Sequence, residues 1–289
     1  MSYLLAIDVG GTSMKGGLVH EQDILTAATS RPTTTHPAGP VAAVRDLTAE
    51  LALAGQAYFG HPPHALALAV PGVVEDNVAR YSATLGWRDV PAEAFSALDH
   101  VPVVLSNDVL AAGLAEAAFT PEQDFLFLAI GTSIAGALFL DGKPYGTSLT
   151  GQLGHSPVYP GGRLCPCGQR GCLAAYASAS AIATEYGAPH AAAVAEALVA
   201  GSERAERVWR TAVDALALSL AGYTLTLNPQ AVIVGGGLAL SGELLLEPLR
   251  GALAQRLSFH TSPEVRTGRL GQNAGVLGAA RLARRASPR

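Results

Sequence analysis

The chain has 289 residues, of which 49% are apolar and 15% are charged, and its net charge is −4. This composition excludes a disordered chain and offers no basic surface for nucleic acid. No apolar run reaches membrane-spanning length and the N-terminus lacks a signal-peptide pattern, so we expect a cytoplasmic protein without membrane or nucleic-acid partners.

The first predicted element is a hairpin near the N-terminus, and a similar sequence motif, the Gly-Thr-Ser echo of the first, recurs later in the chain. The apolar run YLLAIDV leads into GTSMKGGLV from Gly11, and FLFLAI leads into GTSIAGALF from Gly131. Both predict a strand, a glycine turn and a second strand. Such turns aim backbone N–H groups at a concavity that suits phosphate oxygens. One Gly-Thr-Ser hairpin is common in any protein, but two in matching context predict a duplicated fold with two phosphate-facing hairpins.

Strand and helix signals alternate along the rest of the chain. Apolar strands are expected at 65–70, 101–105 and 231–237, and helices at 109–119, within 177–227, at 242–257 and at 274–284. This alternation predicts α/β layers with a parallel sheet. Ligands of such sheets bind beyond the carboxyl ends of strands. The residues expected at strand ends are Asp8, Gly72, Asn107, Asp108, Gly131 and Gly235.

All three cysteines lie in one short segment, Cys165, Cys167 and Cys172, with His155 ten residues before the first. Three thiolates and one imidazole form a closed tetrahedral set that suits zinc and leaves no open position for catalysis. The alternative is three unrelated buried or free thiols. A redox role is less well supported, because the segment has no C-x-x-C pair. The spacing therefore predicts a structural zinc site.

The order of these motifs resembles the ROK family of repressors and sugar kinases. The matching segments are DVGGTSMKGGLV from Asp8, VPG from Val70, ND at Asn107, GTSIAG from Gly131, GQLGH from Gly151, CPCGQRGC from Cys165 and VIVGGG from Val232. They cover nearly the whole chain in the family's order, and the cysteine segment matches the family's zinc motif position for position. The family's repressors carry a helix-turn-helix before the first glycine turn. Because Asp8 comes almost at once, we expect no such domain here.

The resemblance implies an α/β fold of the duplicated actin-like (ribonuclease H-like) ATPase type, with two lobes around a cleft. The small lobe would comprise residues 1–107, completed by the C-terminal helix at 273–289. The large lobe would comprise residues 108–272 and carry the zinc-binding loop at 155–172. Because family members usually associate, a homodimer or tetramer is also implied.

The resemblance further implies an ATP- and Mg²⁺-dependent hexose kinase, by default acting on the 6-hydroxyl of glucose. Asp108 would be the general base, and Gly72, Asn107, Gln152 and His155 would bind the sugar with it. His155 would give one ring nitrogen to zinc and offer the other to a sugar hydroxyl. The alternative for Asn107 and Asp108 is a helix N-cap, and the two roles are compatible.

The resemblance places the nucleotide against three glycine-containing segments, with Asp8 near the Mg²⁺-bound phosphates. The residues implied are Asp8, Gly10, Gly11, Thr12, Lys15, Gly131, Thr132, Ser133, Gly235, Gly236 and Gly237. Lys15 is equally compatible with a solvated surface lysine. The chain has no Walker A pattern, which disfavours an unrelated P-loop kinase. Polyphosphate stays open as the donor, because the glycine turns do not identify it.

Three positions depart from the residues usual in the family. Gln152 and Ala174 stand where glutamates contact sugar hydroxyls, and Thr84 lies in the loop that often contains an asparagine. Losing a charged acceptor costs about 1.5–3 kcal/mol of binding. The sugar therefore stays open among glucose, N-acetylmannosamine, fructose and other hexoses. A sugar-sensing protein with little or no turnover is the alternative from a different class.

Overall fold

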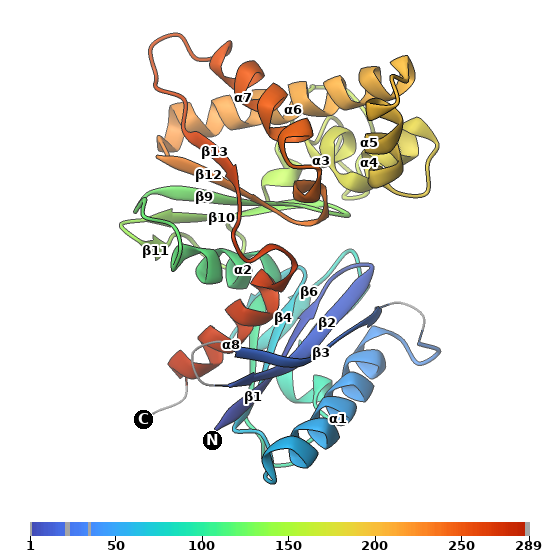
Figure 1. Ribbon diagram of the computed structural model, residues 1–289, viewed down its shortest axis with the longest axis vertical. Helices are drawn as coiled ribbons and strands as arrows, with labels where there is room; N and C mark the ends of the chain where they lie inside the picture. Colours follow the sequence, from blue (N-terminus) through green and yellow to red (C-terminus); the bar gives the residue numbers. More distant parts are fainter. Residues whose placement is uncertain (1, 21–23, 34–35, 287–289) are drawn as a thin grey trace. The chain divides into compact units, whose positions relative to one another are not determined.

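The computed structural model describes residues 2–20, 24–33 and 36–286, and the chain divides into two compact units (Figure 1). Unit 1 comprises Met1–Phe119 and Asn273–Arg289, and unit 2 comprises Thr120–Gln272. The first boundary thus lies beyond the 107/108 division expected from the sequence. The reason is that helix α2 (Asp108–Ala117) packs against α8 (Ala274–Ala286) inside unit 1.

Unit 1 is built on a five-stranded sheet in the order β3-β2-β1-β4-β8. Its strands are β1 (Tyr3–Val9), β2 (Ser13–His20), β3 (Ile24–Pro32), β4 (Ala65–Val70) and β8 (Val103–Asn107). Strands β1, β2 and β3 are antiparallel neighbours, whereas β1, β4 and β8 are parallel. The expected parallel sheet is therefore limited to three strands, because the tight turn after β1 is too short for a parallel crossover.

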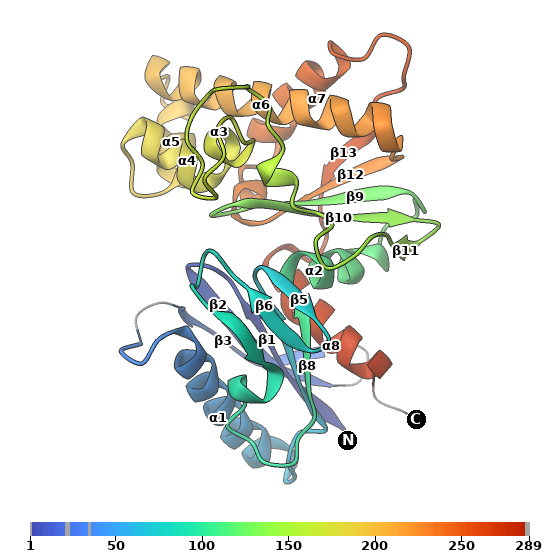
Figure 2. The same ribbon diagram turned by 180° about the vertical axis from the view of Figure 1, so that it is seen from behind.

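The two faces of β1 contact different layers of unit 1 (Figure 2). Tyr3, Leu5, Ile7 and Val9 belong to a core cluster that includes buried residues of α1 (Pro40–Phe59). Asp8 points to the opposite face, as the two-residue period of a strand requires, and there it contacts α8. The helix α1 was not among the elements expected from the sequence.

A small antiparallel sheet is inserted between β4 and β8. It consists of β5 (Val73–Glu75), β6 (Val78–Tyr81) and β7 (Arg88–Pro91), and the 3-10 turn η1 (Ala92–Phe95) follows it. The ring of Trp87 packs edge-on against Phe95, with 5.2 Å between centroids. This contact anchors the loop between β6 and β7 on the core of unit 1.

Unit 2 repeats the sheet of unit 1, with the strand order β11-β10-β9-β12-β13. Its strands are β9 (Phe125–Ile130), β10 (Ile134–Leu140), β11 (Lys143–Pro144), β12 (Ala231–Gly235) and β13 (Glu264–Thr267). The first three are antiparallel neighbours, and β9, β12 and β13 are parallel. Since order and direction both agree with unit 1, the duplication expected from the Gly-Thr-Ser echo is confirmed.

Helices cover the sheet of unit 2 and form its core with it (Figure 1). They are α3 (Ala174–Ala177), α4 (Ala179–Tyr186), α5 (Ala191–Val199), α6 (Glu203–Leu227) and α7 (Glu243–Ala254), with 3-10 turns η2 (Leu153–His155) and η3 (Gly237–Ser241). Another 3-10 turn, η4 (Gly271–Asn273), precedes α8. The indole N–H of Trp209 on α6 donates to the carbonyl of Leu244 at 3.1 Å, which ties α6 to α7. Within the described ranges, no helix combines the length and apolarity needed to cross a membrane.

Candidate functional site

The polar candidates of unit 1 lie where its three parallel strands end. Asp8 on β1 is opposite Ala69 on β4, and Asn107 on β8 is opposite Val70, the last residue of β4. Asp108 follows Asn107 directly as the first residue of α2. Because parallel strands end at one edge of a sheet, the structure brings Asp8, Asn107 and Asp108 to the same edge.

Asn107 and Asp108 have different local roles. The side-chain oxygen of Asn107 accepts the N–H of Leu110 at 2.9 Å, so Asn107 is the N-cap of α2. Its amide nitrogen donates to the carbonyl of Gly72 at 2.8 Å, which joins the end of β8 to the segment after β4. The carboxyl of Asp108 accepts the N–H of its neighbour Val109 at 2.9 Å. The capping role therefore belongs to Asn107 and leaves the carboxyl of Asp108 available for chemistry.

Two carboxyl groups at this edge have raised pKa values. Burial raises the pKa of Asp8 to about 6, against the opposing charge of Lys15, its cross-strand neighbour on β2. Burial also raises the pKa of Asp108 to about 7; the charge of Asp8 adds to that rise, and the N–H of Val109 opposes it. Lys15 is half-buried, and its charge acts on the carboxyl of Asp8. A carboxyl group with a pKa near 7 is suited to accept a proton at neutral pH.

The first glycine turn, residues 10–12, lies immediately after Asp8. The N–H of Gly10 donates to the carbonyl of Ser13 at 3.0 Å, and the hydroxyl of Thr33 donates to the carbonyl of Gly10 at 2.8 Å. A Cβ on Gly11 would lie 2.4 Å from the methyl carbon of Thr84, so a side chain there would have to displace Thr84. Thr84, one of the positions that depart from the family, therefore packs directly on the turn.

The second glycine turn, Gly131 to Ser133, lies in a connection between paired strand residues that is one residue shorter than in the first hairpin, 131–133 against 10–13. Strand pairing resumes between Ile130 and Ile134 in unit 2, whereas in unit 1 it resumes between Val9 and Met14. The carbonyl of Gly131 accepts the N–H of Ala179, the first residue of α4, at 2.8 Å. The side chains of Thr132 and Ser133 are exposed at this turn.

The three glycines at the end of β12, Gly235 to Gly237, differ in what they contact. A Cβ on Gly235 would lie 2.6 Å from the ring of Phe127. Gly236 has a φ of +79°, and a Cβ there would lie 2.5 Å from the carbonyl oxygen of Ile130. Gly237 begins η3 and has open space at its Cβ position. The first two glycines are thus required by backbone geometry and close packing.

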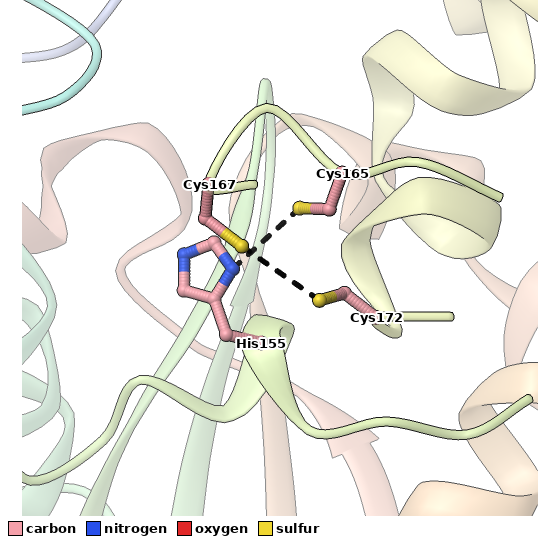
Figure 3. Close-up of side chains that lie close together, drawn as sticks. All are labelled: His155, Cys165, Cys167 and Cys172. Atoms are coloured by element: carbon pink, nitrogen blue, oxygen red, sulfur yellow. Dashed lines mark hydrogen bonds between the residues drawn. The ribbon is translucent and has the colours of Figure 1, made fainter. Parts of the chain in front are cut away.

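Figure 3 shows four side chains of unit 2 converging on one point: His155, Cys165, Cys167 and Cys172. Their ligand atoms all lie within 4.8 Å of one another. Nδ1 of His155 is 3.7 Å from Sγ of Cys165, and Sγ of Cys167 is 3.8 Å from Sγ of Cys172. The structure therefore brings together the four ligands expected from the sequence.

These distances fit a tetrahedral zinc ion. Zinc–sulfur bonds of about 2.3 Å and zinc–nitrogen bonds of about 2.05 Å give tetrahedron edges of about 3.8 Å between sulfurs and about 3.6 Å between sulfur and nitrogen. Burial also raises the pKa of the Cys172 thiol to about 12. Three thiolates so close together need a bound cation to offset their charge. The site is compatible with structural zinc, and the described residues place four ligand atoms around it.

Backbone hydrogen bonds hold the loop 155–172, which carries the four candidate zinc ligands, in place. The N–H of Cys165 donates to the carbonyl of Gln169 at 2.8 Å, and this closes a tight turn around Cys167. The N–H of Leu173 donates to the carbonyl of Ser156 at 2.9 Å, which joins the two ends of the loop. The loop is therefore a closed element that presents its ligands to one point.

Gly171→Ala is expected to damage the zinc site far more than Gly168→Ala. Both glycines have positive φ, +81° and +93°, so both substitutions carry a similar backbone strain. A Cβ on Gly171 would lie 1.8 Å from the carbonyl oxygen of Tyr159, whereas one on Gly168 meets nothing within 4 Å. We expect Gly168→Ala to cost about 1 kcal/mol of stability and to keep its metal. Gly171→Ala should cost several times more and lose metal, as measured by thermal unfolding and metal analysis; equal effects would contradict this.

The two departures from the family that lie in unit 2, Gln152 and Ala174, have different environments. Ala174 begins α3, is 8% exposed and belongs to the apolar core cluster. Gln152 is exposed just before the η2 turn that carries His155. Position 174 therefore provides a methyl group in an apolar setting, and position 152 provides a neutral amide at the surface.

Two glycines of α8 were missed by the sequence analysis. Gly275 lies against the carboxyl of Asp8, and Gly278 lies against the backbone of Ala111 on α2. The sequence contains a pattern that indicates them: two glycines three residues apart inside an otherwise helical, Ala-rich segment predict close packing on one helix face. What they contact depends on a partner far away in the sequence.

Comparisons with known proteins agree with this architecture. The sequence matches the ROK family profile over residues 4–286. It is 32% identical to the glucokinase of Thermotoga maritima over 96% of each chain, and 30% identical to the N-acetylmannosamine kinase of Yersinia pseudotuberculosis over 97% of this chain and 98% of that one. The structure matches a ROK family glucokinase from Streptomyces griseus, solved with glucose and AMPPNP, with a TM-score of 0.87, 26% identity and coverage of 98% and 100%. The expected actin-like α/β fold is thereby confirmed.

Proposed function

The chain belongs to the ROK family, and we propose that it is an ATP-dependent hexose kinase in which Asp108 is the general base. Glucose, phosphorylated at its 6-hydroxyl, is the substrate we propose first. The observation that carries the proposal is the pair of carboxyls at the end of the unit 1 sheet. Asp108, with a pKa raised to about 7, lies near Asp8, which is next to the first glycine turn.

The proposed reaction transfers one phosphoryl group and one proton. The sugar oxygen forms a bond to the γ-phosphorus while the bond from that phosphorus to the bridging oxygen of ADP breaks. The electron pair of the broken bond leaves with ADP, and the hydroxyl proton passes to the carboxylate of Asp108. The N–H of Val109 holds Oδ1 of Asp108 at 2.9 Å and so fixes the orientation of the carboxylate. Asn107 would help to orient the sugar near Gly72.

The phosphate contacts that we propose in unit 1 are Asp8, Lys15 and the turn 10–12. The nucleotide contacts that we propose in unit 2 are the second turn and Gly235 to Gly237. Mg²⁺, when bound with ATP, neutralises charge on the phosphates. The carboxyl of Asp8 fits such a cation. Burial raises its pKa to about 6 even beside Lys15, so the charge of the buried carboxylate is not fully offset by the protein and a cation would stabilise it. Its carboxylate would orient the cation's coordination shell, and the backbone N–H groups of the turn would hold phosphate oxygens.

His155 would connect the zinc site to the sugar. Nδ1 faces the sulfur of Cys165, so zinc would be held through Nδ1 and the proton would stay on Nε2. That N–H is then a donor with a fixed direction. We propose that it donates to a sugar hydroxyl, with Gln152 as a second polar contact from the same segment.

The choice of sugar depends on the two replaced glutamates. The buried methyl of Ala174 provides no hydrogen bond, and the amide of Gln152 provides an uncharged one. N-acetylmannosamine, fructose and other hexoses are therefore the alternatives to glucose, and one curated relative is an N-acetylmannosamine kinase. The same two changes also favour the second candidate, a sugar-sensing protein with little or no turnover.

The first experiment is ADP release with ATP and Mg²⁺ across hexoses, hexosamines and N-acetylhexosamines. In parallel, polyphosphate replaces ATP as the donor, and the formation of sugar phosphate is measured. Turnover with one sugar supports the kinase proposal and identifies the substrate. Sugar binding measured by calorimetry, without ADP release from ATP and without sugar phosphate formation from polyphosphate, would replace the kinase with the sensor.

The rate constant kcat/KM is expected to rise with pH and to level off above about pH 7. Only the ionised form of Asp108 accepts a proton, and its pKa is raised to about 7. Below about pH 6 the carboxyl of Asp8 protonates as well, so the slope should steepen there. Initial rates between about pH 5.5 and 8.5 test this. A flat profile over that range would mean that the base has an ordinary carboxyl pKa.

A further inference from the structure

Two buried glycines in the first turns of α8 contact the functional edge of unit 1. Gly275 and Gly278 are three residues apart and therefore share one face of the helix. Glycine is the least favourable helix residue after proline. Two of them on one buried face therefore call for a specific packing reason.

Gly275 lies directly against the carboxyl group of Asp8. A Cβ at Gly275 would lie 2.3 Å from Oδ2 of Asp8 and 2.4 Å from its Cγ. Lys15 is the cross-strand neighbour of Asp8 and interacts with its charge. The carboxyl of Asp8 is thus placed by the α8 backbone and by the charge of Lys15.

Gly278 lies against the backbone of α2, the helix that begins with Asp108. A Cβ at Gly278 would lie 1.9 Å from the carbonyl oxygen of Ala111. The guanidinium of Arg281 donates to the carbonyl of Ala115 at 2.7 Å, so the contact between the two helices continues one turn further along. The helix α8 is thereby in contact with Asp8 through one glycine and with the helix that carries Asp108 through the other.

We propose that Gly275 is a positioning residue that holds the carboxyl of Asp8 in its working place relative to Asp108, with Gly278 setting the distance between α8 and α2. The inference rests on the proposed kinase function. A side chain at position 275 displaces the carboxyl of Asp8 and leaves the backbone in place, because the clashing atoms are the end of a short side chain. A side chain at position 278 forces two helix backbones apart.

Gly275→Ala tests the proposal, because the variant is expected to fold. We expect kcat to fall about 10- to 100-fold, since small displacements of positioned groups cost that much, while the KM for sugar stays within about twofold. Sugar binding measured directly without nucleotide should be unchanged. An unchanged kcat would overturn the proposal.

A double-mutant cycle with Asp8→Ala separates positioning from general damage. Without the carboxyl of Asp8, the Cβ that Gly275→Ala introduces meets no carboxyl group. The substitution then only replaces glycine with a residue that favours the helix. It should then leave residual single-turnover activity unchanged and raise the melting temperature by about 1–3 °C. In the wild-type background the same substitution should not raise it. Equal effects in both backgrounds would mean that Gly275 does not act through Asp8.

Gly251→Ala on α7 is the matched control, because a Cβ there meets nothing within 4 Å. It should leave kcat unchanged in both backgrounds. The outcomes also separate this inference from the proposed function. A wild type without turnover on any sugar and donor contradicts the kinase, whereas the melting-temperature cycle still tests the contact between Gly275 and Asp8.

Discussion

Asp108→Asn is expected to lower kcat by about 10²–10⁴-fold and, at pH 8, to raise the melting temperature. The loss of activity follows because an amide does not accept the hydroxyl proton. The gain in stability follows because burial, with the charge of Asp8, makes the ionised carboxylate unfavourable in the folded state. Asparagine keeps an oxygen that accepts the N–H of Val109, so the start of α2 should be preserved.

The sign of the stability effect follows from the raised pKa. The pKa of Asp108 is about 7 in the folded chain and 3.8 as the ordinary value, so the folded state binds the proton more tightly. Its contribution to stability is complete below about pH 3.8 and is lost as pH rises to about 7. The variant's advantage should therefore be about 1–3 kcal/mol at pH 8, allowing for partial exposure, and should shrink towards pH 4.

Asp99→Asn is the control for this variant, because Asp99 is an exposed aspartate of the same unit. It should change neither activity nor melting temperature. Thermal unfolding at several pH values, together with ADP release, distinguishes the outcomes. If Asp108→Asn kept a tenth or more of the activity, the base would be another group. If it lost activity and stability together, Asp108 would have a structural role.

Removing the metal is expected to have the second largest effect. Freshly purified protein should contain about one zinc per chain, and Cys172→Ser should remove most of it. Metal binding contributes folding free energy, so the melting temperature should fall by about 10 °C or more. Because the loop carries His155, sugar affinity should fall as well. Metal analysis, thermal unfolding and sugar binding by calorimetry measure the three effects.

Arg170→Ala is a suitable control for the metal experiment. Arg170 lies in the same loop, is exposed and donates to the carbonyl of Gly162, but it offers no ligand atom. It should keep its zinc and its melting temperature within a few degrees. Substoichiometric zinc in the wild type, with no change in unfolding after chelation, would mean that the cysteines are packed thiols.

Much of the fold followed from local patterns. The apolar run at 65–70 became β4, all six of whose residues are buried, and the two Gly-Thr-Ser hairpins became the first hairpins of two matching sheets. These features depend on runs of apolar residues and on the turn residues that end them, and both can be recognised along the chain. The helix α1 and the small sheet β5–β7 were not anticipated. Their apolar patterns are interrupted, and the core on which these elements pack determines which of their side chains are buried.

The candidate site was predictable in part for the same reason. The spacing of His155 and the three cysteines limited their ligand atoms to a short loop, and the structure brings them within 4.8 Å. The ND pair was placed correctly at a strand end. Which member caps the helix was decided by the path of α2, whose N–H of Leu110 meets Asn107.

The sequence by itself determined the family, the duplicated fold and the set of candidate residues for the chemistry, because these depend on motif order and on spacing along the chain. Only the tertiary structure decided how those residues behave. The raised pKa of Asp108 depends on burial and on the charge of Asp8, and Asp8 is placed by Gly275 from the other end of the chain. Such effects act through space between residues that are distant in sequence, so no local pattern records them.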